Sequence, residues 1–207
     1  MCNKLQSKYE CPFDVWLMQI IIPQLKYYYS AGLTPNNVTT MSIIFGVLSA
    51  YCIYIKYNLL AAILLMISYY FDCVDGALAR KYNMVTKFGD YYDHIGDLFK
   101  LILITISLYI TAAYKITISS MKSVKVSSRH KIYTIILIIT FIIQSIHIGF
   151  QECIYNKKNE SSFLNIIRKC VEYISYDPHS AILYTRHMGC GHWYLLFTII
   201  IAIWNKK

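Results

Sequence analysis

Residues 59–80 read LLAAILLMISYYFDCVDGALAR, and this stretch decides the class of fold. No charged residue occurs in it before Asp72, and it is long enough for a transmembrane helix, which needs about 20 mostly apolar residues. Asp72 and Asp75 follow near its end. Because acids at membrane depth are costly and require a partner, they mark a functional site by default. The stretch therefore predicts a spanning helix that carries part of a site.

The acidic residues of the chain are concentrated around this helix end. Five of the eleven fall within 26 positions: Asp72, Asp75, Asp90, Asp93 and Asp97. The first two stand at i, i+3, and the last two at i, i+4 on a helix predicted to start near Gly89, so each pair shares one helix face. If the two helices are antiparallel neighbours, we expect four carboxylates to meet: Asp72, Asp75, Asp93 and Asp97.

Carboxylates at that density share protons or bind cations. Oxygen ligands without matching His or Cys favour Mg²⁺ or Mn²⁺ over Zn²⁺. Two such ions neutralise a diphosphate and orient an in-line displacement. Between the acids, Gly76 and Ala79 keep the helix surface low, and Arg80 offers a fork to phosphate oxygens. Gly89 is expected to let its helix begin close against the helix of residues 59–80.

The rest of the chain predicts an all-α, polytopic membrane bundle of five or six transmembrane helices. Residues 161–187 are a poor span by hydropathy and are either a sixth helix or a surface excursion. Residues 13–31 predict an N-terminal amphipathic helix on the membrane surface, with a buried helix as the alternative. The expected spans are residues 38–55, 59–80, 89–114, 132–151 and 188–204.

Composition agrees with a membrane protein. The chain is 57% apolar and 15% charged, against about 25% charged in soluble domains. The net charge of +9 fits residues that meet anionic lipid headgroups. A nucleic-acid binder shares the charge but not the long uncharged runs, so no nucleic-acid partner is expected. The seven scattered cysteines do not form a disulfide framework.

The pattern Asp72-x2-Asp75-Gly76-x2-Ala79-Arg80-x8-Gly89-x3-Asp93-x3-Asp97 resembles the signature of the CDP-alcohol phosphotransferase family at all eight fixed positions. The resemblance implies a six-helix membrane bundle preceded by an amphipathic helix. It implies two Mg²⁺ or Mn²⁺ ions held by Asp72, Asp75, Asp93 and Asp97, with Asp97 also taking the proton of the acceptor hydroxyl. It further implies that Gly76 and Arg80 hold the diphosphate of the donor.

Two weaker likenesses concern the nucleotide. The run Pro35-Asn36-x-x-Thr39 is similar to an upstream nucleotide-contacting motif of the family, although helix capping by Thr34 and Pro35 explains part of it. Thr86 stands where family members place a small hydroxyl near the donor phosphate. Asn36, Thr39 and Thr86 are therefore candidate nucleotide contacts.

By this resemblance the chain transfers a phosphatidyl or other phospho-alcohol group from a CDP-alcohol to an acceptor alcohol, with release of CMP, in phospholipid biosynthesis. Residues 79–83 are similar to the run found in phosphatidylinositol synthases, which suggests inositol as the acceptor. Asp93-His94-x-x-Asp97 looks more like the choline and ethanolamine branch, which uses diacylglycerol. The short chain favours CDP-diacylglycerol as the donor. An intramembrane prenyltransferase and a non-enzymatic cation-binding protein are the alternatives from other classes.

Several other polar residues receive a plainer interpretation. We interpret Asp90 as a solvated acid in the first helical turn, and His94 as a packing or hydrogen-bonding residue. His187, Cys190 and His192 lack a zinc-site spacing and suggest a turn loosened by Gly189 and Gly191. For Arg168, Lys169 and Arg186, a solvated or lipid-facing position is favoured over the alternative, in which one of them anchors a phosphate group of the acceptor.

The expected organisation is an interfacial segment, residues 1–33, and a catalytic membrane domain, residues 34–207. The expected partners are the CDP-alcohol donor, the acceptor alcohol and the lipid bilayer, and a second copy of the chain is a further candidate. The endoplasmic reticulum or another membrane that faces the cytoplasm is the expected location.

Overall fold

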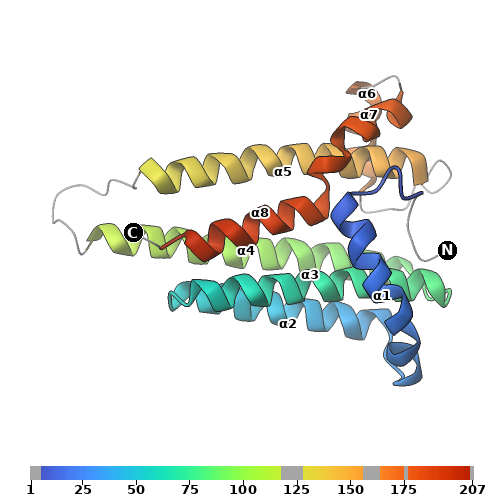
Figure 1. Ribbon diagram of the computed structural model, residues 1–207, viewed down its shortest axis with the longest axis horizontal. Helices are drawn as coiled ribbons and strands as arrows, with labels where there is room; N and C mark the ends of the chain where they lie inside the picture. Colours follow the sequence, from blue (N-terminus) through green and yellow to red (C-terminus); the bar gives the residue numbers. More distant parts are fainter. Residues whose placement is uncertain (1–5, 118–127, 156–163, 175–176, 206–207) are drawn as a thin grey trace.

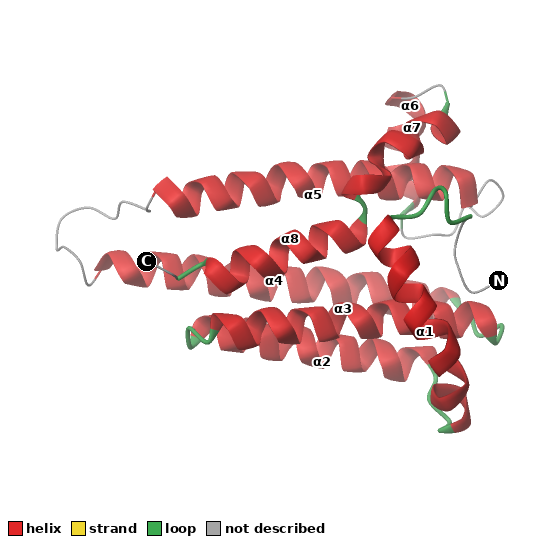
Figure 2. Ribbon diagram, viewed as in Figure 1, coloured by secondary structure: helices red, strands yellow, loops and turns green. Residues whose placement is uncertain are grey.

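The computed structural model describes residues 6–117, 128–155, 164–174 and 177–205, and every element among them is a helix (Figures 1 and 2). The elements are α1 (Pro12–Ser30), α2 (Pro35–Tyr54), α3 (Asn58–Lys81), α4 (Lys87–Thr117), α5 (Ser128–Tyr155), α6 (Asn165–Ile174), α7 (Pro178–Thr185), the 3₁₀ helix η1 (Arg186–Met188) and α8 (Cys190–Ile203). The all-α prediction is confirmed.

Four of these helices are long and apolar enough to cross a membrane: α2, α3, α4 over Lys87–Ala112, and α5. Each contains most or all of one predicted span. The last predicted span, residues 188–204, is represented by α8, which has 14 residues. A helix of that length extends about 21 Å, less than the roughly 30 Å of a bilayer core. The molecule is thus a polytopic membrane bundle with four full-length helices among its described residues.

The start of α2 follows from its sequence. Thr34 is the N-cap residue and Pro35 occupies the first turn, as predicted. The Thr34 side chain accepts a hydrogen bond from the Asn37 backbone N–H at 3.3 Å, and Asn37 Oδ1 accepts one from the Thr34 backbone N–H at 2.9 Å. This reciprocal capping box satisfies N–H groups that the first helical turn leaves unpaired. It fixes the residue at which the chain enters the bundle.

Small polar side chains hold α2 against α3. Ser42 donates to the Ser68 carbonyl oxygen at 2.9 Å, and Ser68 donates to that of Ser42 at 2.8 Å. Ser49 donates to the Ala61 carbonyl oxygen at 2.8 Å. Small residues let helix backbones approach closely in membranes, where interhelical hydrogen bonds and packing replace the hydrophobic effect. Helix α2 also packs along α4, so it contacts both of the helices that carry the predicted aspartates.

Helix α1 lies across one end of the bundle (Figure 1). It buries Leu17, Met18, Ile21 and Leu25, which pack in a cluster with residues of α3. Its outer side exposes Trp16, Tyr27 and Tyr29, aromatic residues that suit the headgroup zone. One face of the helix is therefore packed against the bundle, and the position of the other face at a membrane surface stays a prediction.

The poor span at residues 161–187 is a surface excursion in its described part. It contains the short helices α6 and α7, which lie beside the end of α5 (Figure 1). Residues 161–163 and 175–176 of this segment lie outside the described residues. Helix α8 returns into the bundle and packs against α3, where Asn58 donates to the Ile201 carbonyl oxygen at 3.0 Å.

Candidate metal centre

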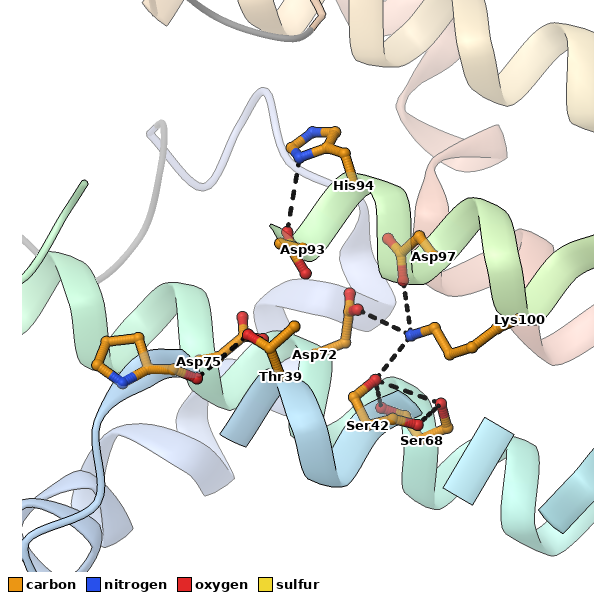
Figure 3. Close-up of polar contacts among 10 residues, drawn as sticks. Thr39, Ser42, Ser68, Asp72, Asp75, Asp93, His94, Asp97 and Lys100 are labelled. Atoms are coloured by element: carbon orange, nitrogen blue, oxygen red, sulfur yellow. Dashed lines mark hydrogen bonds and ion pairs between the residues drawn. The ribbon is translucent and has the colours of Figure 1, made fainter. Parts of the chain in front are cut away.

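Three of the predicted acids form one group. Asp72 of α3 and Asp93 and Asp97 of α4 each place a carboxylate oxygen so that all lie within 4.8 Å of one another. Figure 3 shows Asp72 facing the α4 residues across the gap between the helices. The i, i+4 spacing of Asp93 and Asp97 puts both on the same side of α4. The prediction that acids from two helices meet is confirmed for these three residues.

Asp75, the fourth acid expected to meet here, is not part of this close group, so its place in the centre stays a prediction. It is buried, and its Oδ2 accepts a hydrogen bond of 2.6 Å from the hydroxyl of Thr39 on α2. The i, i+3 spacing therefore places Asp75 on the flank of α3 that α2 covers. Asp75 adjoins the centre from the α2 side, with its orientation set by Thr39 (Figure 3).

Lys100 is the residue of the centre that the sequence reasoning missed. Its Nζ lies 2.6 Å from Asp97 Oδ1 and 3.3 Å from Asp72 Oδ1, and it donates to Ser42 Oγ at 2.7 Å. A signal was present: Lys100 stands three residues after Asp97 and directly before residues 101–114, which carry no charge. A lysine in that position needs an acid as partner, and the nearest acids on its face are the predicted ligands.

The donor set fits a hard divalent cation. It consists of carboxylate oxygens, the ligands that Mg²⁺ and Mn²⁺ prefer. Asp93 Oδ1 is buried and has no hydrogen-bond partner among the described residues. A buried carboxylate oxygen without a partner is costly, and a metal ion would supply one. Mg²⁺ or Mn²⁺ is thus compatible with the residues present.

The side chains flanking the acids have defined neighbours. His94 Nδ1 lies 2.8 Å from the Asp90 carbonyl oxygen, a hydrogen-bonding role of the kind expected from the sequence. It lies 3.8 Å from carboxylate oxygens of both Asp90 and Asp93. The Asp90 side chain is 33% exposed, in agreement with a partly solvated acid in the first turn of α4.

The predicted phosphate-binding residues lie next to each other on α3. The Arg80 guanidinium lies beside Gly76, where an added Cβ would be 3.0 Å from Nη1. The absence of a side chain at Gly76 therefore gives the guanidinium its place along the helix. This arrangement presents a cation one turn beyond Gly76, on the helix that supplies Asp72 and Asp75.

Gly89 lies at the start of α4, and its neighbours differ from the expected ones. An added Cβ there would lie 3.1 Å from Thr86 Oγ1 and 3.2 Å from Asn36 Oδ1. The glycine thus lets α4 approach α2, not α3, because α2 is the helix that packs along α4. Thr86 Oγ1 accepts a hydrogen bond of 3.0 Å from the Gly89 backbone N–H, so it caps α4. The candidate nucleotide contacts Asn36 and Thr86 are brought together here.

A further acid, Asp14 on α1, is half-buried and also escaped the sequence reasoning. The Tyr69 hydroxyl of α3 donates to Asp14 Oδ1. Gly191 of α8 leaves the space that this carboxylate fills, since a Cβ there would overlap Asp14. Burial raises the pKa of Asp14 to about 6, and the Tyr69 hydrogen bond partly opposes that rise. Asp14 thus joins α1 to α3 and α8.

The other residues singled out in the sequence lie apart from the acid group. His192 Nδ1 is 2.9 Å from Cys11 Sγ, and Cys190 Sγ accepts from Gln144 at 2.9 Å. Gly189 is the N-cap of α8. Arg168 pairs with Glu172 at 3.9 Å, and Arg186 donates to the Lys8 carbonyl oxygen at 3.0 Å. The exposed Lys169 lies on α6.

Comparison with known proteins identifies the family. A family model described as CDP-alcohol phosphatidyltransferase matches residues 32–159. The chain is 39% identical over 68 residues to the archaetidylinositol phosphate synthase of Pyrococcus horikoshii, an alignment that covers 33% of this chain and 36% of that protein. It is 30% identical over 81 residues to an uncharacterized protein of Aquifex aeolicus, covering 39% of this chain and 41% of that protein.

No solved structure gives a significant match. The aligned parts amount to about two fifths of the length of each of these two relatives. The family model itself covers more than half of the present sequence and includes every position of the acidic motif. On this match and on the geometry of the acid group, the chain belongs to the CDP-alcohol phosphatidyltransferase family.

Proposed function

We propose that the chain is a membrane enzyme that transfers a phosphatidyl or related phospho-alcohol group from a CDP-alcohol to an acceptor alcohol. The observation that carries the proposal is the group formed by Asp72, Asp93 and Asp97 beside the Gly76–Arg80 pair. In the reaction, the acceptor oxygen forms a bond to the phosphorus that carries the lipid alcohol. The diphosphate P–O bond breaks, CMP leaves, and the acceptor proton passes to a carboxylate.

We propose Asp97 as the carboxylate that takes this proton. Its side chain is 38% exposed, against 30% for Asp93 and 20% for Asp72, which favours Asp97 as the acid that an incoming alcohol meets. Lys100 contacts its Oδ1, so the other oxygen is available to the acceptor. A general base must lie within hydrogen-bond reach of the proton that it takes.

We propose that Mg²⁺ or Mn²⁺ is held by Asp72, Asp75, Asp93 and Asp97, with two ions when the donor is bound. Such ions neutralise the charge of a diphosphate and orient it for displacement. The chain itself contributes Arg80, whose planar guanidinium can hold phosphate oxygens in a bidentate manner. Because Gly76 has no side chain, the guanidinium lies against α3, and a diphosphate bound to it would lie close to the α3 backbone.

We propose that Asn36, Thr39 and Thr86 line the nucleotide side of the site. The closeness of Asn36 and Thr86 to Gly89 supports this assignment. Because the Thr39 hydroxyl already donates to Asp75, Thr39 would act by fixing that carboxylate. The nucleotide would then lie over the ends of α2 and α4, next to the acids.

For the substrates, we propose CDP-diacylglycerol as the donor and an acceptor of the inositol class. The relative from Pyrococcus horikoshii is named for archaetidylinositol phosphate, which supports such an acceptor.

We also propose that residues 34–207 form the catalytic domain and that residues 1–33 form an interfacial segment before it. The proposed location is the endoplasmic reticulum or another membrane that faces the cytoplasm. The proposed assembly is a homodimer. Native mass spectrometry of the detergent-solubilised protein tests the last of these.

The deciding experiment uses purified protein in nanodiscs with Mg²⁺ and CDP-diacylglycerol. Inositol, inositol phosphate, glycerol phosphate and serine are offered in turn, and CDP-choline with diacylglycerol serves as the competing pair. Lipid products are identified by mass and CMP is quantified. We expect CMP release with an inositol-class acceptor. Absence of CMP release with every pair, while Mn²⁺ still binds, would favour a non-enzymatic cation-binding protein.

A further inference from the structure

Lys100 occupies the inner side of the acid group. The residue is 3% exposed, and three oxygen atoms lie within 3.3 Å of its Nζ: Ser42 Oγ, Asp72 Oδ1 and Asp97 Oδ1. The contacts with Ser42 Oγ and Asp72 Oδ1 are hydrogen bonds, and the contact with Asp97 Oδ1 is an ion pair. Figure 3 shows the nitrogen pointing between Asp72 and Asp97 from the α4 side. Lys100 therefore sits where a cation bridging these two acids would sit.

The surrounding helices are shaped to keep Lys100 in this position. An added Cβ on Gly46 of α2 would lie 2.6 Å from both Cγ and Cδ of Lys100, so the missing side chain leaves room for the lysine stem. Ser42, the neutral partner of the ammonium group, is itself anchored to Ser68. With its stem packed against α2 and its ammonium group in contact with three oxygen atoms, Lys100 is a fixed part of the centre.

A fixed ammonium group limits how many divalent ions the acids can hold. Like charges a few ångströms apart in a partly buried site repel each other strongly. Lys100 already neutralises part of the negative charge on Asp72 and Asp97, because its Nζ forms ion pairs with the Oδ1 atom of each. Asp93 lies on the other side of the group and keeps a buried oxygen without a partner among the described residues. An ion at Asp93 and the outer oxygens is then compatible with Lys100, whereas an ion between Asp72 and Asp97 is not.

We propose that Lys100 is a tethered cation that takes the place of one metal ion, so that the donor-free protein binds a single divalent ion. The inference rests on the proposed metal centre and concerns its composition before the donor arrives. It makes Lys100 a positioning residue, which holds Asp72 and Asp97 in place while it reduces the attraction of the acids for a second ion. The diphosphate of the donor would bring the charge that allows the second ion to bind.

The test counts Mn²⁺ directly, by electron paramagnetic resonance of the free ion. The full chain is placed in phosphatidylcholine nanodiscs without nucleotide, and empty nanodiscs give the blank. We expect one bound Mn²⁺ per wild-type chain. In Lys100→Met, which removes the charge and keeps the stem, we expect Mn²⁺ to bind at least about tenfold more tightly, since a nearby positive charge has been lost. Two ions per donor-free wild-type chain would overturn the inference, as would unchanged or weaker binding in Lys100→Met.

Lys131→Met is the matched control, because it removes the same charge from an exposed position at the start of α5. We expect wild-type Mn²⁺ binding from it. An equal gain in Lys131→Met would mean that net charge, not contact with the acids, sets the affinity, and would refute the proposal.

A second variant covers the case in which Lys100→Met fails to fold, as judged by gel filtration and melting temperature. Gly46→Ala keeps every charge but pushes against the lysine stem, and we expect it to tighten Mn²⁺ binding as well. A folded Gly46→Ala with unchanged affinity would contradict the inference. If no Mn²⁺ binds to the wild-type chain, the metal centre itself is wrong, an outcome distinct from the binding of two ions.

Discussion

The hydrogen bond from Thr39 to Asp75 allows a sharp test of how α2 supports the centre. Both residues are 4% exposed, and the bond measures 2.6 Å. Thr39→Val keeps the branched shape and removes the donor, which leaves a buried carboxylate oxygen short of a partner. A hydrogen bond to a charged group contributes about 1.5–3 kcal/mol. Thr39→Ser keeps a hydroxyl at the same position and is the matched control.

We expect the loss to appear in stability and in turnover. For a chain of this size, each kcal/mol corresponds to roughly 2–4 °C in melting temperature, so Thr39→Val should melt roughly 3–12 °C below the wild type in metal-free nanodiscs. If the same free energy is lost in the transition state, turnover falls about tenfold to a hundredfold. Thr39→Ser should lie close to the wild type in both measurements.

The assays are thermal unfolding followed by tryptophan fluorescence and CMP release under single-turnover conditions. A Thr39→Val protein with wild-type melting temperature and wild-type turnover would refute the reasoning that this bond holds Asp75. A Thr39→Ser protein as impaired as Thr39→Val would show that the methyl group, not the hydroxyl, carries the effect.

Four further predictions concern the centre and its neighbours. Removal of divalent ions with a chelator should abolish CMP release, and Asp93→Asn should weaken both Mn²⁺ binding and donor binding; full activity in metal-free buffer would exclude the metal centre. Arg80→Lys should weaken apparent donor affinity, because a point charge replaces a planar fork; an unchanged affinity would remove Arg80 from the site. Asp97→Asn should bind the donor almost normally and lose about 10²–10⁴-fold in single-turnover rate, the usual range for a general base; near-normal turnover would assign the base elsewhere. Burial raises the pKa of Asp14 from 3.8 to about 6, so the folded protein loses stability as pH rises through this interval. The melting temperature of Asp14→Asn should therefore fall less than that of the wild type between pH 4 and pH 7. Parallel melting-temperature profiles of the two proteins over this pH range would contradict this assignment.

Features that depend on local pattern could be predicted from the amino-acid sequence alone. Long uncharged runs predict spanning helices because lipid cannot solvate charges or unpaired backbone groups. Thr34 and Pro35 predicted the start of α2, since capping needs only neighbouring residues. Asp72 stands near the end of one predicted helix, and Asp93 and Asp97 stand at i, i+4 on the next. These positions predicted a shared site, because helical periodicity sets which side chains share a face.

The tertiary structure decided which partner each polar group takes. Asp75 bonds to Thr39, 36 residues away, and Lys100 reaches Asp72, 28 residues away, across the helix interface. Both pairings depend on α2 packing against α3 and α4 together, and on Gly46 leaving room for the lysine stem. Helix spacing fixes the face on which a residue lies. The neighbour on that face is fixed by how the helices pack, and the energy of a buried charge depends on that neighbour.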